Sequence, residues 1–255
     1  MNYIFNENCF KTMQRDELLN NVDLIITSPP NKDLKNIDQK YIDWSVNLFK
    51  SFDNVLKENS CVLYNLNYSK DPMDLFSLIT IIVNNTNFTV IDNIVWKKDI
   101  PTLNNRSKNR LNRTTEYIFV FCRKDEVKSF NTNKSVASYS DKLNRPTSYS
   151  EIDDFIQTKN YDEFNQLNKY SLSVNLIVEL LERYGIKDGL VYDPFMGLGT
   201  TAKGAIKFGM EYVGSEIDVK QVEFTNSELH KINFVDEEYT VDIIESDEDD
   251  EFWND

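Results

Sequence analysis

The chain alternates short apolar runs, rich in β-branched residues, with longer segments whose apolar residues recur at helical spacing. This alternation predicts an α/β fold with a mostly parallel sheet, because parallel strands need helical crossovers between them. Helices are expected over 42–56, 72–83, 174–184 and 200–208, the last two ending at Gly185 and Gly209. The expected strands are Tyr3–Asn6, Val22–Thr27, Cys61–Leu66, Val90–Trp96, Thr115–Cys122, Leu190–Tyr192 and Tyr212–Gly214.

Two stretches depart from this alternation. In Ile94–Cys122 two strand-like runs flank a basic loop with no helical segment between them, which predicts an antiparallel hairpin at one sheet edge. Residues 131–170 are polar, poorly periodic and rich in Ser, Asn, Asp and Tyr. They are interpreted as an insertion that forms a loop region or a target-recognition element, with a short helix over Glu151–Gln157.

A glycine-rich turn follows the strand that starts at Leu190. Gly197 and Gly199 allow the backbone to turn sharply and to approach a ligand closely, and the following helix presents its positive end to that turn. Glu216 follows the next strand, where an acid can accept both hydroxyls of a ribose. This spacing favours nucleoside binding over the alternative, an ordinary β–α turn with a surface acid.

The turn fits neither common phosphate-binding pattern. Ala202 stands where a dinucleotide-binding turn has its third glycine, and Asp193-Pro194 precedes the glycines. A P-loop is excluded because Gly-Lys-Ser/Thr is missing. The sequence therefore predicts a nucleoside ligand without a pyrophosphate.

A second turn ends the strand Val22–Thr27 in Ser28-Pro29-Pro30. The prolines restrict the backbone and remove two N–H donors, which leaves carbonyl oxygens pointing outward from a rigid corner. The Ser28 hydroxyl beside such a carbonyl can accept hydrogen bonds from an amino group. The alternative interpretation is a strand that is simply ended by prolines.

Together the two turns resemble those of the DNA amino-methyltransferases, which methylate the exocyclic nitrogen of adenine or cytosine with S-adenosylmethionine. The resemblance covers Tyr3–Leu229, in the permuted order that puts Ser-Pro-Pro before Asp-Pro-Phe-x-Gly-x-Gly-Thr-Thr, and three more segments match in order: Ile94–Lys97, Thr115–Phe121 and Tyr212–Asp218. It implies a Rossmann-like, seven-stranded, mostly parallel methyltransferase sheet with one antiparallel hairpin strand, spanning residues 1–235. The two turns would lie side by side at the carboxyl ends of the strands.

The resemblance also implies roles for individual residues. S-adenosylmethionine would be held by Glu216 at its ribose and by residues around its methionine half: Asp193, Phe195, Gly197, Gly199 and Thr200. Asn8 would add an acceptor, and the segment 168–172 would add backbone contacts. A base flipped out of double-stranded DNA would enter a pocket formed by Ser28, Pro29, Pro30 and Asn31. Its amino group would donate to Ser28 and to the Pro29 carbonyl, move toward sp³ geometry and attack the sulfonium methyl group without a metal. Ser28 at the head of the motif favours cytosine N4 over adenine N6.

Three positions depart from the family pattern. Asn8 stands where the family often has Asp, Leu198 where it usually has Ser, and Asn31 where it ordinarily has an aromatic ring that stacks on the flipped base. Stacking contributes about 1–3 kcal/mol per base, which a small amide does not supply. The sequence leaves open a weakly active enzyme, an inactive subunit that binds DNA or a partner, and an active site in which another aromatic ring compensates. Methylation of a protein or a small molecule is a further alternative.

The net charge of −14 would argue against nucleic acid, but it is unevenly distributed. Asp236–Asp255 contains eleven acidic residues and no Lys or Arg, which predicts a disordered tail, whereas the rest of the chain has 31 acidic and 28 basic residues. The basic loop is interpreted as a phosphate-contacting surface that the tail competes for, or else as a solvated connector. Its candidate DNA-binding residues are Lys97, Lys98, Arg106, Lys108, Arg110 and Arg113.

Several classes of protein are excluded by composition. The best apolar run, Leu75–Val83, is too short to span a membrane, and the N-terminus does not resemble a signal peptide, so an intracellular protein is expected. The three cysteines lie far apart and the single histidine is not near them, which excludes a recognisable zinc site or disulfide framework. A role in restriction–modification is expected, and the partner stays open between a second copy and a methyltransferase or nuclease subunit.

Overall fold

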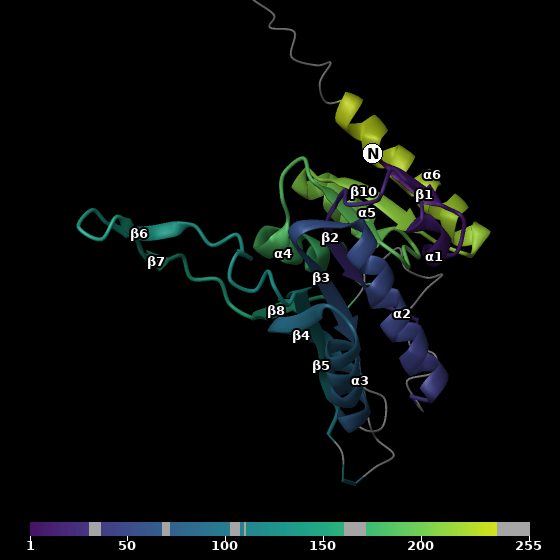
Figure 1. The fold of residues 1–255 in the computed structure, drawn as a ribbon. Helices are drawn as coiled ribbons and strands as arrows, with labels where there is room; N and C mark the ends of the chain where they lie inside the picture. Colours follow the sequence, from purple (N-terminus) through teal and green to yellow (C-terminus); the bar gives the residue numbers. More distant parts are fainter. Residues whose placement is uncertain (31–36, 68–71, 103–107, 110, 161–171, 239–255) are drawn as a thin grey trace, which may run out of the picture.

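The computed structural model describes residues 1–30, 37–67, 72–102, 108–109, 111–160 and 172–238. Its centre is an eight-stranded sheet in the order β1-β10-β9-β2-β3-β5-β4-β8 (Figure 1). Within this sheet β5 runs antiparallel to both of its neighbours and the remaining pairs are parallel, which confirms the expected α/β class. The strands are β1 Tyr3–Phe5, β2 Val22–Thr27, β3 Leu56–Leu66, β4 Phe88–Thr102, β5 Arg113–Arg123, β8 Phe155–Thr158, β9 Leu190–Asp193 and β10 Glu211–Ser215.

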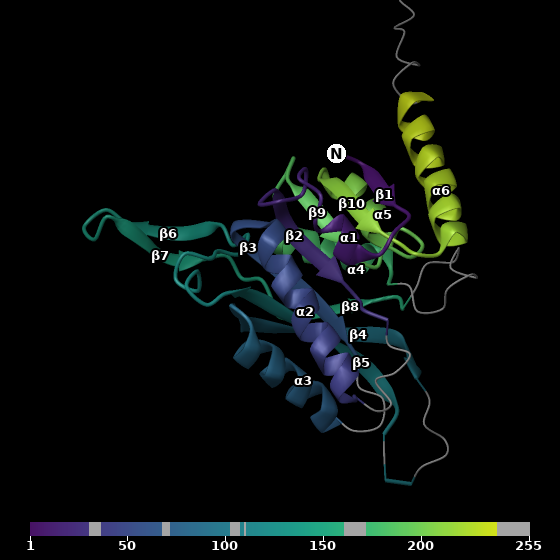
Figure 2. The ribbon, with the colours of Figure 1, turned by 45° about the vertical axis from the view of Figure 1, so that its right-hand side comes forward.

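Helices cover both faces of the sheet (Figure 2). One core layer packs α2 and α3 on the sheet through residues such as Phe49, Phe52 and Leu78, and the other packs α4 and α5 through residues such as Leu180 and Ala202. Because both faces are covered, the central strands are apolar on both sides, which explains the apolar run 24–26 in β2. The helices are α1 Cys9–Thr12, α2 Gln39–Val55, α3 Pro72–Asn85, α4 Val174–Tyr184, α5 Thr200–Phe208 and α6 Val219–Glu238.

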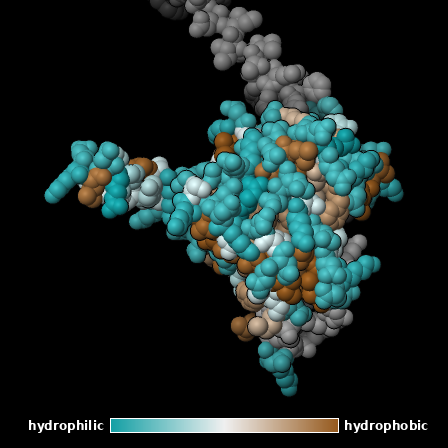
Figure 3. Space-filling view, in the orientation of Figure 1, coloured by the Kyte–Doolittle hydropathy of each residue, from teal (hydrophilic) through white to brown (hydrophobic). Residues whose placement is uncertain are grey.

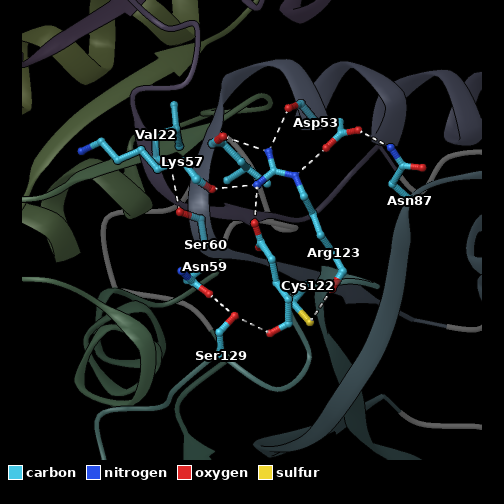
Figure 4. A network of polar contacts seen from close by, with 11 residues as sticks. Val22, Asp53, Lys57, Asn59, Ser60, Asn87, Cys122, Arg123 and Ser129 are labelled. Carbon is cyan, nitrogen blue, oxygen red and sulfur yellow. Dashed lines mark hydrogen bonds and ion pairs between the residues drawn. The ribbon is translucent and has the colours of Figure 1, made fainter.

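Arg123 holds the antiparallel strand β5 in place (Figure 4). Its guanidinium donates to the carboxylate of Asp53 at 2.6 Å, to Glu126 at 3.1 Å, and to the backbone carbonyls of Asp53, Leu56 and Lys57. These carbonyls lie where α2 passes into β3, so one side chain ties the end of β5 to the start of β3. This contact supports the register between the two strands.

The expected helix over Glu151–Gln157 is wrong, because the chain forms the edge strand β8 there and extends the sheet from seven strands to eight. Phe155 to Thr158 pair in parallel with Val95 to Lys98 of β4. Ile156 is buried in the sheet, and the indole N–H of Trp96 donates to the Thr158 hydroxyl at 2.9 Å. Four residues with one buried apolar position suit an edge strand better than a helix.

Residues 134–152 form a hairpin arm that projects from the body, built from β6 Val136–Ser140 and β7 Arg145–Tyr149 (Figures 1 and 2). Its surface is mostly hydrophilic with separate apolar residues (Figure 3). The flanking residues Asn133 and Asp153 both contact Arg183, with a hydrogen bond from the Asn133 N–H to the Arg183 carbonyl at 2.8 Å and one from Arg183 Nε to the Asp153 carbonyl at 3.2 Å. Arg183 lies near the end of α4, where the parallel strands begin, so the arm is rooted at the edge opposite the strand ends.

Helix α6 continues to Glu238, three residues beyond the domain boundary expected at Val235. The remainder of the acidic tail, residues 239–255, lies outside the described residues. None of the helices in the described part of the chain is long and apolar enough to cross a membrane.

Candidate active site

The two predicted turns lie next to each other at the carboxyl edge of the sheet. Strands β2 and β9 pair in parallel, with Leu24 opposite Val191 and Ile25 opposite Tyr192. Ser28 and the Asp193-Pro194 segment therefore leave adjacent strands at nearly the same level. This is the edge where open α/β sheets bind their ligands.

The turn after β9 has backbone conformations and close contacts that only glycine accommodates without strain. Gly197 and Gly199 have φ angles of 53° and 73°, in the left-handed region. A Cβ atom on Gly199 would lie 2.2 Å from Cγ2 of Thr225 in α6, while the Thr225 hydroxyl donates to the Gly197 carbonyl at 3.0 Å. Gly199 is the N-cap of α5 and supplies no capping side chain, which leaves the positive end of this helix facing the turn.

Glu216 joins the glycine turn to the end of β10. One carboxylate oxygen accepts from the Gly197 N–H and the other from the Asp218 N–H, both at 2.9 Å. The side chain is half-buried, and each oxygen retains a lone pair for a further donor. Glu216 therefore holds the glycine turn against the end of β10.

Asp193 lies beneath the same turn and is almost fully buried. It accepts from the Phe195 N–H at 2.9 Å and from the Thr201 hydroxyl at 2.6 Å. Burial raises the pKa of this carboxyl to about 6, although the hydrogen bonds from Thr201 and Phe195 act in the opposite direction. A desolvated carboxylate of this kind is stabilised by a cationic ligand.

The other residues that the sequence predicts at the cofactor differ in burial and in their partners. Phe195 is half-buried, with its ring 5.7 Å from Trp44 of α2, and Thr200 is buried at the start of α5. Asn8 is exposed and uses its side-chain oxygen to cap α1, accepting from the Phe10 N–H at 2.9 Å. The neighbouring acid Glu7 is bound to Arg15, whose hydrogen bond lowers the pKa of Glu7 to about 2.

The Ser-Pro-Pro turn has a partner that the sequence did not indicate. The Ser28 hydroxyl donates to Oδ1 of Asn65 at 3.1 Å, and Nδ2 of Asn65 donates to the Tyr117 carbonyl at 3.4 Å. Asn65 is buried near the end of β3, and its signal in the sequence was a lone amide within the apolar run 61–66. Pro29 is buried and Pro30 exposed, whereas Asn31 lies outside the described residues.

The structure separates the six basic residues expected to bind DNA. Lys97 and Lys98 lie in β4 rather than in a loop, and Arg113 begins β5. Lys98 forms an ion pair with Glu116, and only 13% and 10% of these two side chains is exposed, so Lys98 is a partner of Glu116 rather than a free phosphate contact. Lys97 donates to Gln157 at 3.3 Å, Lys108 is exposed, and Arg106 and Arg110 lie outside the described residues.

The glycine turn and the Ser-Pro-Pro turn thus lie side by side on a sheet whose topology is that of an α/β methyltransferase. The sequence model of the N6/N4 DNA methylase family matches residues 22–227, and the chain belongs to this family. S-adenosylmethionine is accordingly its cofactor. No group of His, Cys, Asp and Glu suited to a metal ion occurs among the described residues.

Known proteins of this kind resemble the chain over most of its length. The orphan methyltransferase M.BamHII of Bacillus amyloliquefaciens is 23% identical, over 82% of this chain and 88% of the relative. The PvuII cytosine-N4-specific DNA methyltransferase has a TM-score of 0.71 at 15% identity, over 89% of this chain and 86% of that one. M1.HpyAVI, in complex with S-adenosylmethionine, has a TM-score of 0.65 at 20% identity, over 90% and 99% of the two chains.

Proposed function

We propose that the protein transfers the methyl group of S-adenosylmethionine to the exocyclic amino group of a base in double-stranded DNA, with cytosine N4 preferred over adenine N6. The observation that carries this proposal is the pairing of β2 with β9, which brings Ser28 and Asp193 to one edge of the sheet. A methyl donor held by the glycine turn and an amino group held by the Ser-Pro-Pro turn would meet there.

The bound cofactor supplies an electrophilic methyl group, and the residues of the chain orient both reactants. Asp193 lies where a buried carboxylate can accept a cationic group, and Glu216 can accept the ribose hydroxyls. Ser28 and the Pro29 carbonyl would accept the two amino hydrogens and so favour sp³ geometry at the nitrogen. Neither amino group is accessible inside a duplex, so the base would have to be flipped out of the helix.

Among the described residues, the proposed DNA contacts lie toward the same edge. Lys97, Lys108 and Arg113 stand on or beside the β4–β5 hairpin, and Arg106 and Arg110 lie between its strands in the sequence. Within 131–170, β8 carries the chain toward this edge, whereas the hairpin arm is rooted at the opposite one. Within the insertion 131–170 we therefore propose that target recognition lies nearer to β8 than to the hairpin arm.

A methylation assay tests the proposal. The full-length chain is incubated with labelled S-adenosylmethionine and mixed-sequence duplex DNA, and the nucleosides are analysed by mass spectrometry. N4-methylcytosine is expected from the native chain and in a much smaller, still measurable amount from Ser28→Ala. Ser51→Ala, which removes a hydrogen bond from a half-buried hydroxyl to the Asn47 carbonyl within α2, is the matched control. N6-methyladenine would reverse the base preference, and the absence of both products would overturn the proposed activity.

The alternative is a catalytically weak or inactive subunit that binds DNA or a partner, and Asn31 motivates it. This alternative predicts that the chain binds cofactor or DNA but transfers no methyl group. Asn31→Tyr distinguishes the two, because activity that appears only in this variant would identify the native chain as a degenerate catalyst.

A further inference from the structure

We propose that Asn65 is a positioning residue that fixes the Ser28 hydroxyl as a hydrogen-bond acceptor toward the substrate amino group. This inference rests on the proposed function, and it assigns a role to a residue on a third strand. The structural basis is the relay from Ser28 through the Asn65 amide to the Tyr117 carbonyl.

The orientation of the Asn65 amide is determined by β5. The β3–β5 register sets Leu66 opposite Tyr117 and Asn65 opposite Ile118, so the Tyr117 carbonyl is a backbone group of the adjacent strand. A carbonyl can only accept, and Nδ2 of Asn65 lies 3.4 Å from it. In the flipped orientation the amide oxygen would face the Tyr117 oxygen, and two acceptors would oppose each other. Because Asn65 is only 2% exposed, water has little access to relieve that repulsion.

This orientation decides what Ser28 presents to the substrate. A hydroxyl has one proton and two lone pairs, and the proton of Ser28 is directed at Oδ1 of Asn65 at 3.1 Å. Its remaining lone pairs can only accept. The prolines that follow have no N–H, so neither the hydroxyl nor the two following backbone groups offers a donor to the amino nitrogen.

The acceptor role matters because the amino nitrogen must keep its lone pair for the methyl group. In the reaction the N–C bond forms while the C–S bond breaks, the electron pair of that bond stays on sulfur, and the nitrogen then releases a proton to solvent. If the hydroxyl could rotate, it would be able to donate to the nitrogen lone pair and oppose the attack. Loss of Asn65 should therefore lower kcat more than it raises KM.

A double-mutant cycle tests this coupling. Asn65→Leu keeps a similar shape but removes both hydrogen bonds, and it should lower kcat on the order of tenfold to a hundredfold, with KM for DNA and cofactor nearly unchanged. In a Ser28→Ala background the same substitution should cause little further loss. An equal loss in both backgrounds, or a loss only in folding measured by thermal unfolding, would overturn the proposal.

Asn65→Asp provides a pH signature. Only the protonated carboxyl can accept from Ser28 and also donate to the Tyr117 carbonyl, as the amide does. The activity of this variant relative to the native chain should therefore rise as pH falls. A constant ratio across pH would contradict the relay.

A third measurement needs no catalysis, so it separates failure of this inference from failure of the proposed function. Ser28→Cys places a thiol against Asn65 while the three native cysteines are buried. The pH dependence of iodoacetamide alkylation at position 28, followed by mass spectrometry, gives the pKa of that thiol. An amide oxygen facing the sulfur disfavours the thiolate, so the pKa should be higher with Asn65 than in the Asn65→Leu background. An equal pKa, or a lower one caused by an amide N–H that turns toward the thiolate, would overturn the proposal.

Discussion

Glu216 accepts a hydrogen bond from the backbone N–H of Gly197 at 2.9 Å, across the gap between β10 and the turn that follows β9. The same carboxylate thus shapes the glycine turn and faces the space where a nucleoside would lie. Glu216→Gln retains one acceptor oxygen but replaces the other with a donor that opposes an N–H group. We expect S-adenosylmethionine affinity to fall by about 1.5–3 kcal/mol, roughly ten- to hundredfold, in calorimetric titration. Glu223→Gln, on the exposed face of α6, should bind like the native chain.

The buried carboxyl of Asp193 should make the free energy of unfolding depend on pH. Its pKa is raised to about 6 in the folded chain from an ordinary 3.8. Between these values the unfolded chain binds fewer protons at this group, so the contribution of Asp193 to stability is present below about pH 4 and is lost as pH rises to about 6. The loss amounts to about 3 kcal/mol. Subtracting the urea-unfolding free energy of Asp193→Asn from that of the native chain across this range should reveal the decrease, and a flat difference would contradict it.

The same group should make cofactor binding depend on pH. If Asp193 receives a cationic group of S-adenosylmethionine, the free protein binds best with the carboxylate ionised. The dissociation constant should therefore increase as pH falls below about 6. In Asp193→Asn this dependence should disappear and binding should be weak throughout the range.

Gly199→Ala should strain the glycine turn after β9 without removing any polar group. The left-handed backbone costs a side chain about 1–2 kcal/mol, and the new Cβ atom would overlap Cγ2 of Thr225. We expect a lower melting temperature together with weaker S-adenosylmethionine binding. Adding Thr225→Ser removes the overlapping methyl group and keeps the hydroxyl that donates to Gly197, so it should restore part of the loss. No recovery would show that the overlap is not the cause.

Lys98 and Lys108 should respond differently although both were predicted to bind DNA. Lys108→Ala removes an exposed charge, and it should weaken DNA binding and reduce the slope of log affinity against log salt by about 1. Lys98→Met leaves Glu116 buried without its ion-pair partner, and breaking such a pair typically costs about 3–5 kcal/mol. It should destabilise the fold while leaving the salt slope unchanged. A reduced salt slope for Lys98→Met would show that Lys98 does contact DNA phosphates.

The acidic tail offers a test of the charge distribution. Ending the chain after Glu238 retains all of α6 and removes eight acidic residues. If the tail competes for the basic residues near β4 and β5, DNA affinity should rise at low salt and converge with that of the full chain at high salt. A tail that only solubilises the protein would leave affinity unchanged at every salt concentration.

Local signals in the sequence were sufficient for much of the fold. The bounds of β2, α4 and α5 agree with expectation, because the strand is mostly apolar and is followed by prolines, and the two helices are amphipathic and end at glycines. The two turns were found for the same reason, since glycine and proline restrict the backbone locally. Their adjacency required the resemblance to a family, because strand order is not encoded in any single segment.

What escaped prediction depends on contacts between distant segments. Asn65 reaches Ser28 only through the register of β2 and β3, and an isolated Asn in an apolar run carries no sign of that partner. In the sequence Lys98 looked like part of a solvated basic loop. In the structure it lies on the same face of β4 as Trp96, where it forms an ion pair with Glu116 of β5. The four-residue strand β8 is too short for its periodicity to outweigh the polar sequence around it.

The pairing of β1 with β10 has a consequence for how the protein is made. Asn2 and Tyr212, which are 210 residues apart, are joined at this edge, whereas β3, β4, β5 and β8 all come from the middle of the chain. During synthesis the strands beside the Ser-Pro-Pro turn can assemble while the first strand still lacks its neighbour. The half of the sheet that carries the glycine turn would be completed last, because closing so long a loop is slow. We therefore expect methyl-donor binding to begin only after both halves of the sheet have joined.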